Sequence, residues 1–75
     1  MNAPYAISGQ SLDSEGTVRP WIGFAYETRQ NLYEVRLYQP NNVIVWLVNG
    51  REASPKDTKV TRLLWSAFWD KEIAQ

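Results

Sequence analysis

The 75-residue sequence contains neither cysteine nor histidine. Without cysteine no disulfide can form, and without either residue a structural zinc site is excluded, because carboxylates alone rarely build one. Nucleophile–base pairs most often use the same two residue types, so the usual centres of covalent hydrolysis are missing as well. The sequence therefore predicts a protein that is not an enzyme, with no catalytic residues, no metal ligands and no cofactor.

Other signatures of catalysis and ligand binding are also scarce. The glycines stand singly, so there is no glycine-rich phosphate loop, and no acidic cluster resembles a calcium loop. Glu27 and Glu34 fall on one face of the expected sheet, where paired acid–base chemistry is conceivable. We interpret them instead as solvated strand residues beside Arg36.

Charge of one sign is not in excess, because eight basic residues balance eight acidic ones. Proteins that bind nucleic acid through its backbone are usually strongly basic, so this balance disfavours that class. A net charge of zero also leaves little repulsion to oppose self-association.

Targeting signals and membrane spans are not expected. The opening residues MNAPYAISGQ have neither the basic start nor the long apolar run of a signal peptide. No stretch approaches the roughly 20 apolar residues that a spanning helix needs. We expect a cytoplasmic protein that does not contact membranes, of the kind found among accessory products of phages and other mobile elements.

The most informative stretch runs from residue 32 to residue 48. Residues 32–38 (LYEVRLY) alternate in polarity like a half-buried strand, and residues 43–48 (VIVWLV) are apolar and mostly β-branched. The turn residues between them predict a hairpin, and TRQN at 28–31 connects it to a further strand at 21–28. The pairing implied by the two turns collects one apolar face. That face comprises Ile22, Phe24, Tyr26, Tyr33, Val35, Leu37, Ile44, Trp46 and Val48.

A C-terminal helix is predicted over residues 55–72. Ser54 is a suitable N-cap, Pro55 suits the first helical position, and Asp57 lies in the first turn. At about 100° per residue the apolar positions form one stripe, which should cover the sheet face. The stripe contains Val60, Leu63, Leu64 and Ala67, with Phe68 at its border. The predicted fold class is α+β, a three-stranded antiparallel meander with one C-terminal helix packed on one face (βββα).

The first 18 residues are polar and rich in small side chains. We interpret residues 1–18 as an N-terminal arm, partly ordered at best, that could add a short strand near residues 5–8. Residues 19–75 then form the single βββα domain.

Two aromatic surfaces remain outside the predicted core. Trp65 and Trp69 are four residues apart on the helix, away from its apolar stripe. The outer sheet face is more apolar than water contact requires, and we expect either the arm or another molecule to cover it. The apolar residues expected on that face are Trp21, Tyr38, Val43, Val45 and Leu47.

These surfaces predict a small non-enzymatic interaction protein that self-associates, as a homodimer, or binds a protein partner. The alternative is nucleic-acid binding through the outer face of the three-stranded sheet. In architecture, though in no residue motif, the expected unit resembles the DNA-reading sheets of plant AP2-type domains and integrase arm-binding domains. A small-molecule pocket between protomers is a third possibility.

Overall fold

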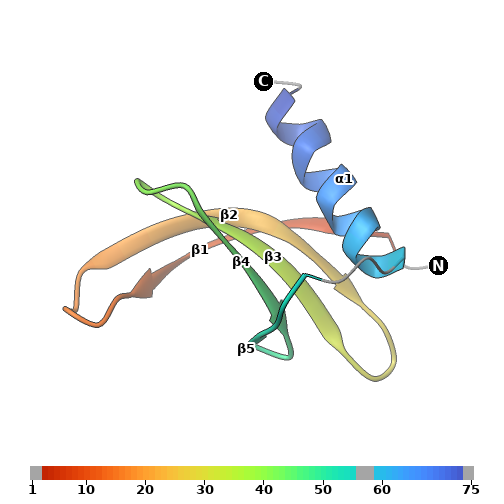
Figure 1. The fold of residues 1–75 in the computed structure, drawn as a ribbon, viewed down its shortest axis with the longest axis horizontal. Helices are drawn as coiled ribbons and strands as arrows, with labels where there is room; N and C mark the ends of the chain where they lie inside the picture. The colour runs from red at the N-terminus through yellow and green to blue at the C-terminus, as the bar shows by residue number, and fades with distance from the viewer. Residues whose placement is uncertain (1–2, 56–58, 74–75) are drawn as a thin grey trace.

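The structure is a computed structural model that describes residues 3–55 and 59–73. Its strands form one antiparallel sheet in sequence order, and the helix described packs on one side (Figure 1). The elements are β1 (Tyr5–Leu12), β2 (Val18–Glu27), β3 (Leu32–Tyr38), β4 (Val43–Val48), β5 (Arg51–Glu52) and α1 (Lys59–Ile73). The α+β class is therefore confirmed, with a C-terminal helix on an antiparallel sheet.

The predicted pairing of the three central strands is confirmed residue by residue. Phe24 pairs with Val35, and Val35 pairs with Trp46. Every other expected pair across these strands is present as well. Alternation and turn chemistry are local properties of the chain, which is why the sequence is sufficient to set this register.

The predicted three-stranded meander is incomplete, because the sheet has five strands within the described residues. Strand β1 pairs with β2 along its whole length of eight residues, well beyond the short strand expected near residues 5–8. The β1–β2 turn is stabilised by Asp13, whose carboxylate accepts backbone N–H groups from Glu15 and Thr17, both at 2.9 Å. Gly16 supplies the positive φ that this turn needs, +80°.

Strand β5 is the second addition and pairs with the end of β4. Asn49 and Gly50 both have positive φ, as the two central residues of a tight type I′ hairpin require. The Asn49 side chain also accepts the backbone N–H of Leu32 at 2.8 Å, which ties this turn to the start of β3.

The core lies between α1 and the sheet. Leu64 and Phe68 are 1% and 2% exposed, and they pack against Phe24 and Val35. The remaining expected face residues apart from Val48 line the same core. The predicted helix stripe needs one correction, because Phe68 is central and Leu63 is 38% exposed. The helix presents the Leu64–Phe68 edge of its apolar side to the sheet, so Leu63 falls beyond the contact.

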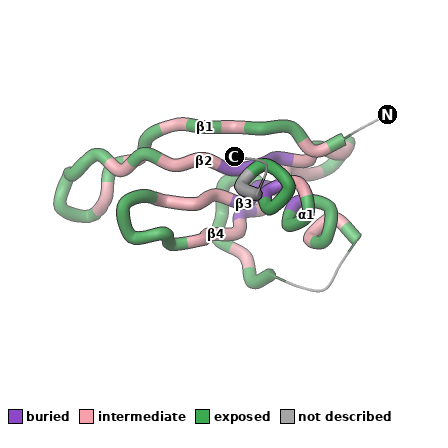
Figure 2. The backbone as a smooth tube through the Cα atoms, turned by 90° about the horizontal axis from the view of Figure 1, so that it is seen from above, coloured by how far each residue is buried: buried purple, intermediate pink, exposed green. Residues whose placement is uncertain are grey.

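Helix α1 covers only part of its face of the sheet. The β1–β2 hairpin and the β3–β4 loop extend beyond it (Figures 1 and 2). The described helix begins at Lys59 and residues 54–55 are not helical, so the predicted start at 55 is too early. The predicted first-turn acid at residue 57 lies outside the described residues. No helix in the described ranges has the length and apolar character needed to cross a membrane.

The sheet is arched, with α1 on its convex side (Figure 1). Gly23 permits a close approach in the middle of β2, since a Cβ atom there would lie 1.9 Å from the carbonyl oxygen of Val35. On the concave side, residues are buried although no described helix covers them. Ala25 is 2% exposed and Leu47 is 7% exposed.

Candidate functional site

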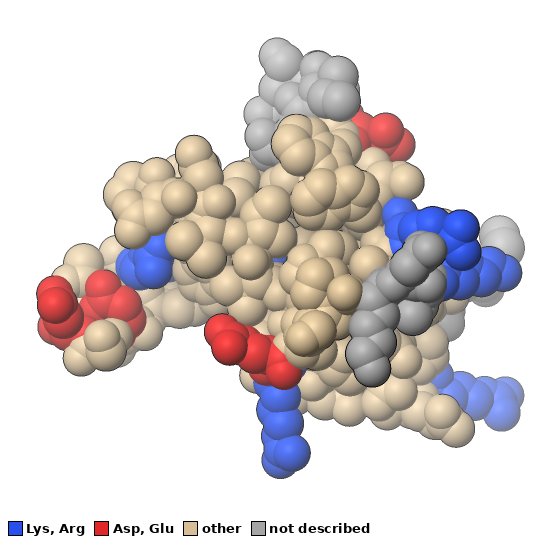
Figure 3. Space-filling model, in the orientation of Figure 1, with Lys and Arg blue, Asp and Glu red and all other residues tan. Residues whose placement is uncertain are grey.

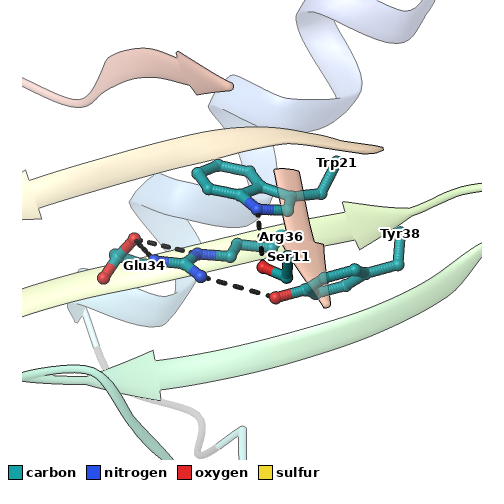
Figure 4. Close-up of polar contacts among 5 residues, drawn as sticks. All are labelled: Ser11, Trp21, Glu34, Arg36 and Tyr38. Atoms are coloured by element: carbon teal, nitrogen blue, oxygen red, sulfur yellow. Dashed lines mark hydrogen bonds and ion pairs between the residues drawn. The ribbon is translucent and has the colours of Figure 1, made fainter. Parts of the chain in front are cut away.

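The concave face carries a group of interacting polar and aromatic side chains, here called the concave cluster (Figure 4). They come from β1, β2 and β3, and the strand register places them on one face because directly opposed residues share a face. The cluster consists of Ser11, Trp21, Glu34, Arg36 and Tyr38.

Arg36 forms a buried ion pair with Glu34. The two residues alternate on β3, so their side chains lie on the same face. Arg36 donates from Nε at 3.0 Å and from Nη2 at 2.7 Å, and both bonds go to Oε2 of Glu34. The side chains are 21% and 7% exposed, respectively. The predicted view of Glu34 as a solvated strand residue is therefore wrong, because the arch of the sheet removes its carboxylate from water.

Trp21 covers this ion pair. Its ring centroid lies 4.1 Å from the Arg36 guanidinium carbon, a cation–π contact (Figure 4). The indole N–H donates to Ser11 Oγ at 3.1 Å, so its polar atom already has a partner within the chain. Gly9 gives the ring its space, since a Cβ atom there would lie 2.7 Å from the indole.

Tyr38 completes the cluster through its hydroxyl. Arg36 Nη1 donates to Tyr38 Oη at 3.4 Å, and Trp21 and Tyr38 ring centroids are 6.4 Å apart. Burial of the phenol opposes its ionisation, but hydrogen bonds with Ser11 and Arg36 and the positive charge of Arg36 outweigh that effect. The pKa of Tyr38 is consequently lowered. Burial likewise opposes the charge on Arg36, while the bonds to Tyr38 and Glu34 favour it and raise the pKa of Arg36.

A hollow of about 380 Å³ adjoins the cluster. Arg19 lies at its wall, with its guanidinium carbon 5.6 Å from the centroid of the Tyr38 ring. Nη2 of Arg19 is buried and has no hydrogen-bond partner among the described residues. The hollow is lined by Arg19, Arg36, Tyr38, Val43, Val45, Leu47, Gly50 and Glu52.

The predicted interface residues divide into two groups. Trp21, Tyr38, Val43, Val45 and Leu47 share the concave face, and the expected row of Trp21, Tyr38 and Val43 is present in the pairing. Their exposure differs widely. Val43 is 44% exposed and Leu47 only 7%, while the other three are half-buried. The structure therefore brings these five residues together on one face, and of the five only Val43 is exposed to solvent.

Trp65 and Trp69 lie on the opposite side of the sheet, on α1. They remain 39% and 41% exposed. Trp65 stacks on Trp46 of β4 with centroids 5.8 Å apart, and Trp69 meets Trp65 edge-on at 5.5 Å. The three rings form a continuous aromatic flank along the helix, here called the tryptophan flank. Trp46 was expected only as a core residue, and its contact with Trp65 depends on the helix position.

The sequence interpretation counted Arg19 among the arginines that permit nucleic-acid binding, but it placed neither Arg19 nor Ser11 on this face. Both lie where the predicted arm becomes the β1–β2 hairpin, and Ser11 pairs directly with Arg19. The only sequence signal was Asp13 followed by Gly16, a turn that would have folded the arm back onto β2.

The side chains of these two surfaces offer groups for contact and hydrogen bonding. In the part of the chain that the structure describes, no three acidic side chains gather to hold a metal ion. The concave cluster offers a fixed charge pair, aromatic faces and hydrogen-bond donors, and the tryptophan flank offers apolar area. Comparison with models of protein families, with curated proteins and with solved structures finds no match to this chain.

Proposed function

We propose that this chain is a non-enzymatic interaction protein that forms a homodimer through its helix-side face. The observation that carries the proposal is the exposure of Trp65 and Trp69, 39% and 41%. Helix α1, which carries both residues, leaves part of its face of the sheet uncovered (Figure 1). Exposed tryptophan is costly in water and is enriched where partners bind.

The uncovered part of the sheet is apolar as well. Leu12 and Val18 face each other across the β1–β2 hairpin and are 70% and 53% exposed. Leu37 and Ile44 pair across β3 and β4 and are half-buried at the edge of the core. We call these four residues the open floor. They lie on the same face as the helix, because each pair follows the register that places Phe24 and Val35 inward.

A second copy of the chain suits these two surfaces. In a twofold dimer the same patches meet reciprocally, so the tryptophan flank of one protomer could lie on the open floor of the other. Net charge does not oppose this contact, since the chain is neutral. Uncharged side chains form most of the surface visible in Figure 3, with acidic groups mainly at the left and lower centre and basic groups mainly at the right and bottom. A 75-residue chain with no disulfide also gains from burial beyond its own core.

The concave face is a poorer dimer surface than the sequence suggested. Its aromatic residues already have partners within the protomer, since Trp21 bonds Ser11 and covers Arg36. Leu47 is almost fully buried. Little apolar area on that side would be gained by association, so the helix side is favoured.

The test is the mass in solution at high micromolar concentration, measured by analytical ultracentrifugation. We expect a wild-type dimer, and Trp69→Glu should make it monomeric by placing a charge in an apolar contact. Val43→Glu is the matched control, because Val43 is equally exposed, at 44%, but lies on the concave face. A dimer split by Val43→Glu and not by Trp69→Glu would reverse the assignment, and a wild-type monomer would refute self-association.

Nucleic-acid binding remains the alternative, favoured by the incompletely bonded guanidinium of Arg19 beside the Tyr38 ring. Glu34 and Glu52 share that face and offset its two arginines. We expect no binding to random duplex DNA at physiological salt by fluorescence anisotropy. Backbone binding would show a steep salt dependence, with a log–log slope of about −0.9 per phosphate contacted.

A further inference from the structure

The hollow on the concave face brings together hydrogen-bond donors that have no acceptor among the described residues. Arg19 is the clearest case. Its guanidinium forms no hydrogen bond or ion pair with any described residue, and its Nη2 atom is buried. A buried N–H donor without a partner is unfavourable, so this atom points to a missing acceptor.

Arg36 supplies the second set of donors. Its guanidinium carries five N–H groups, and three of them are used by Glu34 and Tyr38. The remaining N–H groups belong to a side chain that lines the hollow. The ion pair with Glu34 holds the guanidinium plane in place, which fixes the direction of the unused donors.

Tyr38 supplies the third donor. Tyr38 Oη accepts a hydrogen bond from Arg36 Nη1 at 3.4 Å, and the hydroxyl proton of Tyr38 takes no part in that bond. With Oη occupied as an acceptor, the proton of Tyr38 is available to another group. Three side chains with hydrogen-bond donors thus line one hollow, and two of them are positively charged, so the group best suited to bind there is an anion.

We propose that this hollow binds a small carboxylic acid in its ionised form, with the carboxylate between Arg19, Arg36 and Tyr38. The planar carboxylate matches the fork geometry of a guanidinium. Val43, Val45 and Leu47 line the hollow from β4, so a short apolar chain attached to the carboxylate lies against them. The volume of about 380 Å³ is in the range of small-ligand sites.

Two acidic side chains lie near this site and affect its affinity for an anion differently. Glu34 is already bonded to Arg36 and is 6% exposed, so its charge is compensated. Glu52 lines the hollow from β5 and is exposed, and within the described residues it forms no ion pair with either arginine. Its charge repels the anion, and its removal should strengthen binding.

The experiment titrates the ¹⁵N-labelled protein with hexanoate and follows the amides of Val45, Leu47 and Gly50 by NMR. We expect saturable shifts with hexanoate, weaker binding of acetate, which lacks the apolar chain, and none with the neutral isostere hexanamide. Arg19→Gln should weaken hexanoate binding by at least about tenfold. Arg29→Gln, an exposed arginine in the β2–β3 turn, is the matched control and should change it by less than about twofold.

Glu52→Gln gives an independent readout, because it alters an exposed side chain and leaves the fold intact. Hexanoate affinity should rise by a factor of about two to five, an effect that added salt reduces. The proposal is overturned if hexanamide binds as well as hexanoate, if no saturable shift occurs with hexanoate, or if Arg19→Gln behaves like Arg29→Gln.

Discussion

The two faces of the sheet bury their residues in different ways. On the convex face, Leu64 and Phe68 of α1 exclude water from Phe24 and Val35, as a second layer normally does. On the concave face no helix lies among the described residues, yet Ala25 and Glu34 are as well buried as core residues. A sharply arched sheet can thus create a second buried region from its own side chains, without a second layer.

The chemistry of the two regions differs in the same way. The helix-side core is held by apolar contacts, which have no preferred direction. Beside it, Trp65 and Trp69 of the tryptophan flank remain exposed. The concave cluster is held by hydrogen bonds and an ion pair centred on Arg36, and beside it the buried Nη2 atom of Arg19 has no hydrogen-bond partner among the described residues. Exposed apolar area suits a protein partner and a donor atom without an acceptor suits an anion, which is why we propose a different occupant for each face.

The helix-side core should show the largest mutational effect. Phe68→Ala removes a ring that is 2% exposed and leaves a cavity, at a cost of about 3–5 kcal/mol in the free energy of unfolding. Trp69→Ala, the adjacent residue at 41% exposure, should cost about 1 kcal/mol or less in the monomer. Urea unfolding measures both, and equal losses would show that the core reaches further around α1 than its contacts indicate.

The second largest loss in the free energy of unfolding is expected when the ion pair of the concave face is broken. Arg36→Met leaves the carboxylate of Glu34 buried without a partner, which we expect to cost about 2–3 kcal/mol, because the Arg36 side chain is itself 21% exposed. The double variant Glu34→Gln with Arg36→Met should recover part of the loss, with a coupling of about 1 kcal/mol or more. Strict additivity in urea unfolding would mean that the pair does not stabilise this face.

A smaller loss of stability is expected from a substitution in β1 beneath the ring of Trp21. Gly9→Ala places a methyl group 2.7 Å from the indole, which must shift and loosen its bond to Ser11. We expect about 1 kcal/mol of destabilisation and a moved indole N–H resonance of Trp21. Ser8→Ala is the control on the neighbouring residue of β1, which is exposed, and an unmoved indole resonance in Gly9→Ala would contradict the packing.

The smallest effect concerns ionisation of Tyr38. Burial resists it, but Ser11 and Arg36 stabilise the phenolate, so the folded pKa lies below the ordinary value of about 10. Because the folded pKa is lowered, this group adds stability at alkaline pH, and the contribution is lost as pH falls through the folded pKa. Ultraviolet titration should reveal one early tyrosine step in the wild type that is absent from Tyr38→Phe, and identical curves would count against the hydrogen-bond arrangement.

Much of the central sheet was predictable from local patterns. Alternation in β3 and the turns on either side of it set which residues of β2, β3 and β4 oppose one another, and this spacing alone placed Trp21 beside Tyr38. The same register placed Glu34 and Arg36 on one face. Their burial was not predictable, since a flat sheet would have left both in water.

Sequence by itself therefore determined the register, the apolar face and the presence of a C-terminal helix, because each follows from spacing and turn chemistry within a few residues. Tertiary structure decided three further points. It extended the polar segment Tyr5–Leu12 into a full strand that brings Ser11 and Arg19 to the cluster, and it set the helix rotation that buries Phe68 but exposes Leu63. It also produced the arch, since the curvature of a sheet arises from the packing of all its strands together and is not encoded in any one of them.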